Sequence, residues 1–543
     1  MGLIVTATGI GSAAAVTFAA DKRAHLAVAI AFLLVLGLIA LSAGRHPVRP
    51  LYPIYPAAFV AFAIAYVALG LAGGGSAAPI ALYLAVAALA TAATPGGYRP
   101  LTVGSFALWT PAIRSFGPHP FDPSFPLPVA AAAVLSLVTL VALLIRRDAL
   151  SPDERVRRIG LALLSLACVA VVVDRHASVA SPGTLAPDDL LALAAVGLYP
   201  LLAVLRLRPR TRDGIAIGLA LAIYAAAAAA LIVGQDYLVD TVVAQHRATE
   251  LFLQGADPYQ ATDVIAALRD RGLVPELGTH LEDGSQLHGY TYPALSFLIP
   301  APFLAFGATD LRLVYLGEIL LLLLVLPRAV RSAWRPLVAA VVVGSTVVLR
   351  QNVAAGVDPA YAVFLVLALL SLRHRTVSPI CVGLAVASRQ PAWIFVPFYV
   401  AAIWRRDGRR EVLRRTAILV VAALLPNLPF LIAAPGAFLG GVSAPMVQPL
   451  EPYGVGLVSF ALAGVIPLWP RAVYGLLSAV VLAGLLVLLV RRWRALPYAL
   501  VAFPSLVLWF SWRSAENYFG FAGVFALIGD ETMQADAEPA PQP

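Results

Sequence analysis

Charged residues are scarce in this chain. They make up 12% of its 543 residues, and hydrophobic residues make up 60%, whereas soluble domains carry about 25% charged residues. Lysine occurs only at Lys22, so almost every positive charge is an arginine. The arginines cluster in short loops between apolar runs, as in the cytoplasmic loops of membrane proteins. The net charge of +9 therefore does not indicate a nucleic-acid partner.

Potential metal ligands and phosphate-binding loops are also few. Cys168 and Cys381 both lie inside apolar runs, where we expect buried thiols and neither a disulfide nor a metal site. His246, His280 and His288 lack the spacing of metal ligands, so the sequence predicts no metal. It also has no glycine-rich loop that would hold a phosphate, which argues against direct use of ATP or a nucleotide sugar. No cofactor is predicted.

Long apolar runs are what the chain does contain. Runs of about 17–25 residues recur along it, and each can cross the roughly 30 Å hydrocarbon core of a bilayer. The sequence predicts an all-α, polytopic protein of the plasma membrane, surrounded by membrane lipids, with about 12–15 membrane helices. The expected spans lie near 24–43, 54–73, 77–95, 125–145, 159–174, 188–206, 214–234, 311–327, 336–350, 356–373, 416–434, 472–490 and 496–511.

Two apolar segments do not fit a simple crossing. Residues 291–307 contain two prolines, and they cannot cross together with the next apolar run if the arginines that follow are cytoplasmic. We therefore expect 291–307 to form a re-entrant or interfacial helix. Residues 377–403 lie between two arginine clusters. We expect a hairpin there with Arg389–Gln390–Pro391 at its tip, because proline disfavours a helical conformation of the preceding residue.

Residues 235–290 form the one long polar segment of the chain. If every arginine cluster is cytoplasmic, the span at 214–234 delivers this segment to the outer side of the membrane. We divide the chain into three parts. Residues 1–213 form N-terminal membrane helices of unassigned role, residues 214–529 form a membrane region that includes the outer loop 235–290, and residues 530–543 form a disordered tail.

Two carboxylates open the polar segment, Asp236 and Asp240. They are four residues apart, so they would share one face if the segment began as a helix. A carboxylate beside a low-dielectric membrane surface would suit a general base that accepts a hydroxyl proton. Alternatively, the two residues mark only the point where a helix emerges into water. The spacing alone favours neither interpretation.

Several short motifs follow one another along the chain. They are Asp240, Ala248-Thr-Glu-Leu251, Gly255-Ala-Asp-Pro-Tyr259, Tyr290-Thr-Tyr-Pro293, Ala387-Ser-Arg-Gln-Pro-Ala-Trp393 with Pro397, Asn427-Leu-Pro-Phe430 and Arg513-Ser-Ala-Glu-Asn-Tyr518. In this order and spacing they resemble the family 87 membrane glycosyltransferases of the GT-C superfamily. The resemblance covers residues 214–528, whereas nothing in 1–213 matches. Ala294 stands where that family usually has a second proline, and His246 stands where related sequences often carry an acid.

The resemblance implies that 214–529 is a GT-C-like region that transfers a sugar, commonly mannose, from a polyprenyl-phosphate sugar. The acceptor would be a lipid or cell-envelope glycan on the outer face. By the resemblance, Asp240 is the base, with Asp236 in reserve. It deprotonates the acceptor hydroxyl, which attacks and inverts the anomeric carbon. The lipid phosphate leaves as an anion, so a nearby cation would stabilise it.

Arg389, beside Gln390, is the main candidate for the phosphate-binding cation, because a charge within a membrane is costly and indicates function. The alternative interpretation is that Arg389 has a structural role and pairs with a carboxylate such as Glu318. Arg350 and Arg513, at predicted outer ends of spans, are further candidates. We expect Asp358 to cap a helix.

Three tyrosines belong to the predicted site, namely Tyr259, Tyr290 and Tyr292. Their rings would suit stacking on a sugar, but tyrosine is also common at membrane interfaces for other reasons.

Two other functions remain open from the sequence. A transporter or lipid flippase would be expected to show repeated halves with paired broken helices, and the chain shows one such hairpin and one asymmetric outer loop. A non-catalytic cell-envelope assembly protein that keeps the fold is the other alternative, since a fold does not fix a function.

Overall fold

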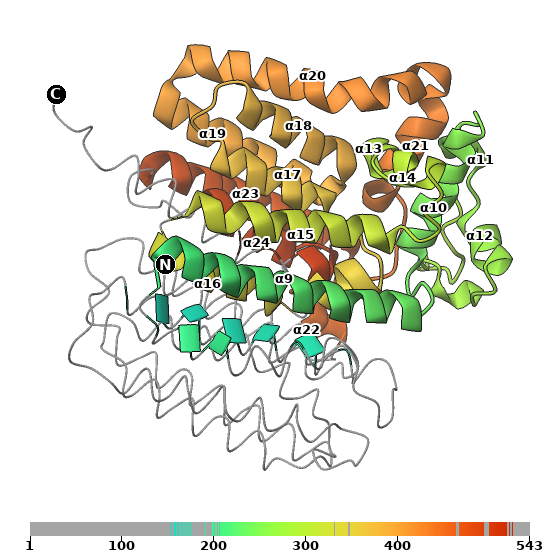
Figure 1. Ribbon diagram of the computed structural model, residues 1–543. Helices are drawn as coiled ribbons and strands as arrows, with labels where there is room; N and C mark the ends of the chain where they lie inside the picture. The colour runs from blue at the N-terminus through green and yellow to red at the C-terminus, as the bar shows by residue number, and fades with distance from the viewer. Residues whose placement is uncertain are drawn as a thin grey trace.

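The computed structural model describes residues 207–330, 332–345, 348–454, 456–462, 466–492 and 499–518, with scattered residues from 154 to 205 and at 521 and 524. This part is predominantly helical, as predicted (Figure 1). The predicted tail 530–543 and most of the predicted region 1–213 lie outside the described residues. Cys168 and Cys381 are free thiols, and both are buried, as expected for cysteines in apolar runs.

The described helices range from one turn to seven turns. The longer ones are α9 (Pro209–Gly234), α10 (Asp240–Leu253), α15 (Arg312–Ala329), α16 (Arg335–Val343), α17 (Ala360–Leu370), α18 (Val377–Ser388), α19 (Phe395–Asp407), α20 (Arg409–Ala433), α21 (Pro435–Val447), α23 (Arg471–Arg492) and α24 (Ala499–Trp509). The shorter ones are α11 (Pro258–Ala261), α12 (Val264–Asp270), α13 (Leu295–Leu298), α14 (Ala301–Ala305) and α22 (Val458–Leu462). Two short strands, β1 (Tyr453–Gly454) and β2 (Arg513–Ser514), pair in parallel.

The long helices run side by side and share one apolar core. In Figure 1, α9, α15, α17, α18 and α20 form successive rows, and α10 to α14 and α21 gather at one end of these rows. The core includes aliphatic and aromatic side chains of α9, α15 to α20, α23 and α24. At one point α18 touches α20 without intervening side chains, because a Cβ at Gly383 would lie 2.5 Å from the Leu419 carbonyl oxygen.

Three described helices, α9, α20 and α23, are long and apolar enough to cross a membrane. A fourth crossing results if the bent pair Ser332–Val343 and Val348–Ala354 counts as one span. The described residues are thus compatible with an all-α membrane protein, but they supply fewer full-length spans than the apolar runs predicted. The run at 356–373 shows why, because only the 11 residues of α17 are helical, and these cover about 16 Å.

The two unusual segments adopt interrupted conformations. Residues 291–307 form α13 and α14, which together extend over 11 residues and are too short to cross. Residues 377–403 break where predicted. After α18, Arg389 is extended (φ −154°, ψ 143°), and a 3-10 turn at Gln390–Ile394 leads into α19.

The polar segment is not a simple loop. Its helices α10, α11 and α12 pack with α13, α14 and α21 around a second apolar core at the end of the long helices. Residues of that core include Val243, Leu268, Phe297, Phe430 and Phe438. The segment therefore forms a small helical cap on the long-helix bundle.

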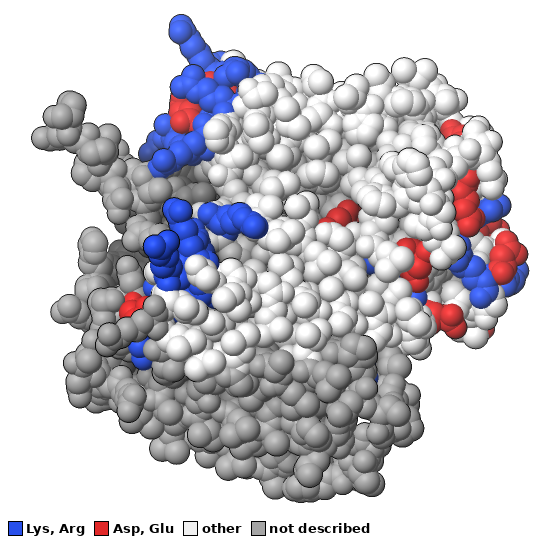
Figure 2. Space-filling model, viewed as in Figure 1, with Lys and Arg blue, Asp and Glu red and all other residues white. Residues whose placement is uncertain are grey.

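Charge separates along the molecule (Figure 2). Basic side chains gather at one end, where α9 and α20 begin and α15 and α19 end. The opposite end, formed by the helical cap, carries acidic and basic side chains together. The visible face between the two ends is almost entirely uncharged, as expected of a surface that contacts hydrocarbon.

Candidate active site at the helical cap

Asp240 is the first residue of α10, and Asp236 lies in the linker before it. Gln235 (φ −139°) and Val239 (φ −142°), at the two ends of the linker, are extended, and the residues between them are not helical. The shared helical face considered for the two carboxylates is therefore not formed. Asp236 is exposed, whereas Asp240 is half-buried and accepts two hydrogen bonds on Oδ2, from the backbone N of Thr279 at 2.8 Å and from its Oγ1 at 2.6 Å.

Arg312, at the start of α15, holds this linker in place. Its side chain is only 3% exposed and pairs with Asp310 at 2.6 Å. The guanidinium also lies 5.0 Å from the centre of the Tyr237 ring. Sequence reasoning missed Arg312, although an Asp-Leu-Arg run before an apolar stretch was a visible signal. Four backbone carbonyl oxygens accept its remaining hydrogen bonds, those of Ile232, Gln235, Asp236 and Ala354.

His246 is buried on α10 behind the linker. Its Nδ1 lies 2.8 Å from the Tyr237 hydroxyl, which also accepts a hydrogen bond from the Leu311 backbone N. Its Nε2 faces Glu250 at 3.4 Å. Burial and the charge of Arg271 lower the pKa of His246 to about 4. The imidazole is therefore neutral at pH 7, and its Nδ1 can accept a hydrogen bond from the Tyr237 hydroxyl.

Two of the three predicted tyrosines belong to the core of the cap. Tyr259 and Tyr290 are 7% and 1% exposed, and their rings meet edge to face at 5.6 Å. Tyr259 also packs on Phe438 at 4.9 Å and donates its hydroxyl to the Tyr292 carbonyl oxygen. The Tyr290 hydroxyl bonds Ser296. Their rings are thus not available to stack on a sugar, because aromatic side chains from α20 and α21 and from 290–298 surround them.

Tyr292 is the tyrosine that links the predicted residues. Its side chain is half-buried, and its hydroxyl lies 3.0 Å from Oγ1 of Thr241, the residue after Asp240. Its ring lies 4.9 Å from the guanidinium carbon of Arg389, a distance at which a cation and an aromatic ring attract each other. Tyr292 thus contacts the predicted cation through its ring and, through its hydroxyl, the residue that follows the predicted base.

Arg389 is fixed by the break between α18 and α19. It is 5% exposed and donates from Nη1 to the Asp358 carbonyl oxygen at 3.0 Å. Among the residues that the structure describes, no carboxylate forms an ion pair with it, so the alternative pairing with Glu318 is not made. The neighbouring Gln390 donates to the carbonyl oxygens of Thr291 and Val442, which fastens the turn to the segment that carries Tyr292.

Asp358 lies one residue before Pro359, the N-cap residue of α17, and its carboxylate binds the start of that helix. Its Oδ1 accepts the backbone N–H of Ala360, the first residue of α17, at 2.7 Å. Its Oδ2 accepts from the side chain of Gln245 on α10 at 3.2 Å, and Gln245 in turn accepts the Tyr315 hydroxyl. The same carboxylate therefore connects the cap to the long helices.

The other two predicted arginines lie on neighbouring segments. Arg350 belongs to the π-helical segment Val348–Ala354, which packs against Glu516–Tyr518. Arg513 lies in β2, donates to the Glu451 carbonyl oxygen at 3.4 Å and stacks on Tyr453. Neither residue directly contacts Asp240 or Arg389 through any hydrogen bond or ring contact seen in the described part.

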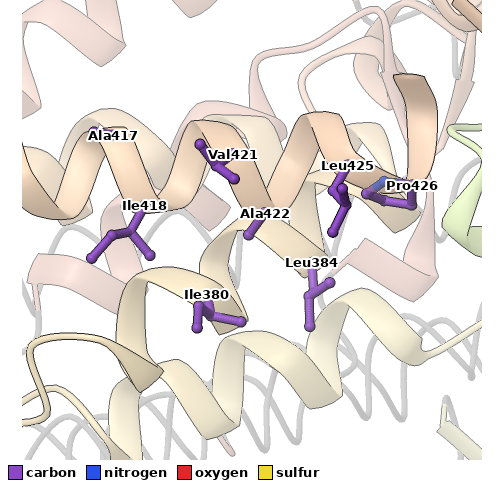
Figure 3. A pocket seen from close by; sticks show the side chains of 8 residues that line it. All are labelled: Ile380, Leu384, Ala417, Ile418, Val421, Ala422, Leu425 and Pro426. Carbon is purple, nitrogen blue, oxygen red and sulfur yellow. The ribbon is translucent and has the colours of Figure 1, made fainter. Parts of the chain in front are cut away.

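An apolar groove of about 600 Å³ opens between α18 and α20 (Figure 3). It runs from Ala417 and Ile380, past the close Gly383 contact, to Pro426. The next residue, Asn427, accepts a hydrogen bond from the backbone N of Ala294, two residues after Tyr292. One end of the groove therefore adjoins the segment that stacks on Arg389. Its lining residues are Ile380, Leu384, Ala417, Ile418, Val421, Ala422, Leu425 and Pro426.

Within the described ranges, no three His, Cys, Asp or Glu side chains come together as metal ligands. Comparisons of the chain with models of protein families, with curated proteins and with solved structures find no match.

Proposed function

We propose that this protein is a membrane glycosyltransferase of the GT-C type, similar to family 87. It would transfer a hexose, with mannose favoured, from a polyprenyl-phosphate sugar to a lipid or cell-envelope glycan acceptor. The observation that carries the proposal is the arrangement around Tyr292. This residue contacts Thr241, next to the carboxylate Asp240, and stacks on the buried Arg389.

The proposed reaction is a single displacement with inversion. Asp240 accepts the proton of the acceptor hydroxyl, and the hydroxyl oxygen attacks the anomeric carbon of the donor. The bond between that carbon and the phosphate oxygen breaks, so the polyprenyl phosphate departs with the bonding electron pair. Arg389 supports this step because its buried guanidinium forms no direct ion pair within the described part and interacts with the Asp358 carboxylate only at longer range. A cation in this state can stabilise the departing phosphate.

The surroundings of the site suit a donor held in the membrane. The groove between α18 and α20 is apolar (Figure 3), so it can accept the hydrocarbon chain of a lipid. At its Pro426 end it adjoins Asn427, which binds the segment that carries Tyr292. The basic end of the molecule (Figure 2) would lie in the cytoplasm by the positive-inside rule. The helical cap would then face the outer side of the plasma membrane.

Sugar transfer by membranes that contain the protein tests this function. Radiolabelled polyprenyl-phosphate mannose would be supplied to the parent, Asp240→Asn and Asp236→Asn at matched expression. We expect transfer by the parent, a loss of at least 100-fold in Asp240→Asn and a smaller effect in Asp236→Asn, whose carboxylate is exposed. Loss only in Asp236→Asn would move the base to the linker. No transfer by the parent would contradict the proposal and favour a transporter or a non-catalytic role.

A further inference from the structure

Thr279 is held in place from several directions. Its carbonyl oxygen accepts the backbone N–H of Leu287 at 2.9 Å. The preceding Gly278 packs so closely that a Cβ there would lie 2.6 Å from Cδ1 of Ile265 on α12. Gln286 donates from its side chain to the Pro275 carbonyl oxygen at 2.7 Å. The hydroxyl and the backbone N–H of Thr279 are therefore presented to α10 from a braced turn.

This turn is also joined to the chain after α21. Leu281 and Leu450 form an antiparallel bridge, and Glu451 donates its backbone N–H to the His280 carbonyl oxygen at 3.1 Å. Thr279 thus connects Asp240 to a segment more than 200 residues away in the sequence.

The two hydrogen bonds from Thr279 distinguish the two oxygens of Asp240. Both donors reach Oδ2, and no residue in the described part donates to Oδ1. A carboxylate held through one oxygen cannot rotate freely, so its other oxygen has a defined position for accepting a proton. The Asp236 carboxylate, by contrast, is exposed, and it accepts no hydrogen bond from the residues that the structure describes.

We propose that Thr279 is the positioning residue for the base, and that it orients Asp240 so that Oδ1 receives the proton of the acceptor hydroxyl. The inference rests on the proposed glycosyl transfer and deepens it, because it assigns the base to the carboxylate that is held. Thr279 acts through Asp240 and has no role in binding the lipid donor.

Steady-state transfer kinetics of the parent, Thr279→Val and Thr279→Ser test this role. Valine keeps the shape and the backbone donor but removes the hydroxyl, whereas serine restores it. Because one hydrogen bond to a charged group is lost, we expect kcat to fall roughly 10- to 100-fold in Thr279→Val. The KM for polyprenyl-phosphate mannose should stay within about twofold, and Thr279→Ser should recover most of the parent kcat.

Thr262→Val is the matched control. Thr262 lies in the same cap, is 7% exposed, and its buried hydroxyl has no hydrogen-bond partner among the described residues. Its kinetics should equal those of the parent. Unfolding midpoints of all variants would show whether each is folded. If Thr279→Val does not fold, Thr279→Cys replaces it, because cysteine has a similar size and a weaker hydrogen-bond donor. The kcat of Thr279→Cys should lie between those expected for the valine variant and the parent.

The outcomes separate the two proposals. A parent that transfers sugar and a folded Thr279→Val with the parent kcat would overturn the role of Thr279 and leave the glycosyltransferase intact. A rise in KM with an unchanged kcat would overturn it as well, since it would place Thr279 in donor binding. A parent that transfers no sugar would overturn the proposed function and this inference together.

Discussion

Replacement of Arg312 should loosen the linker that carries Asp236. Arg312→Met keeps much of the side-chain volume but leaves Asp310 and four backbone carbonyl oxygens without the guanidinium. Removing one partner of a buried ion pair typically costs about 3–5 kcal/mol. Asp310 retains some solvent contact, with 20% of its side chain exposed. We therefore expect a loss near the lower end, about 3 kcal/mol.

The loss of stability on replacing Arg312 depends on the planar set of N–H donors of the guanidinium as well as on its charge. Arg312→Lys keeps the charge, but its ammonium cannot reproduce the planar geometry that reaches four carbonyl oxygens. We expect it to recover about half of the loss in Arg312→Met. Arg271→Met is the matched control. Arg271 also lies over the Tyr237 ring, at 5.3 Å, but its side chain is 30% exposed and its bond to Glu250 is 3.3 Å long. That change should cost less than about 1 kcal/mol.

Equilibrium unfolding in mixed detergent and denaturant measures these differences, and hydrogen exchange locates them. Amides of residues 235–239 should exchange faster in Arg312→Met than in the parent, because the carbonyl oxygens around them are released. Equal losses in Arg312→Met and Arg271→Met would refute the reasoning, since they would show that the buried hydrogen bonds add nothing to a surface ion pair. Unchanged exchange at 235–239 would refute the role in the linker.

Two further predictions concern pH and packing. The pKa of His246 is about 4 in the folded protein and near 6.5 in the unfolded chain, so the unfolded state binds more protons between these values. The contribution of His246 to the free energy of unfolding should therefore be full above pH 6.5 and should fall by up to about 3 kcal/mol as the pH drops to 4. His246→Asn should flatten this slope when unfolding is measured as a function of pH. A parent protein whose stability shows no such slope would contradict the assigned pKa. Gly383→Ala should cost about 1–3 kcal/mol because its Cβ would meet Leu419 of α20, whereas Gly484→Ala, at an open position of α23, should gain about 0.5–1 kcal/mol. Equal unfolding midpoints for the two alanine variants would contradict the close contact.

Local sequence features were sufficient to predict the class of the protein and its main interruption. The scarcity of charge and the long apolar runs predict membrane helices, because burial in hydrocarbon depends on composition alone. The break at Arg389 follows from Pro391, which has no N–H to continue the hydrogen bonds of α18 and stands at the start of the next turn. The resemblance brought Asp240 and Tyr292 into one candidate site, and in the structure Tyr292 contacts Thr241, the residue after Asp240.

The tertiary structure decided how those residues can act. Asp236 and Asp240 do not share a helical face, because the chain between them is not helical. Arg312, more than 70 residues away, holds the start of this linker through the carbonyl oxygens of Gln235 and Asp236. Tyr259 is a core residue because Phe430 and Phe438 arrive from α20 and α21.

Spacing along the chain determines which residues can lie on one helix, and the sequence settled this much by itself. The orientation of a carboxylate or a ring is set instead by hydrogen bonds and packing with segments distant in the chain. Only the folded structure brings such segments together, as Thr279 does for Asp240.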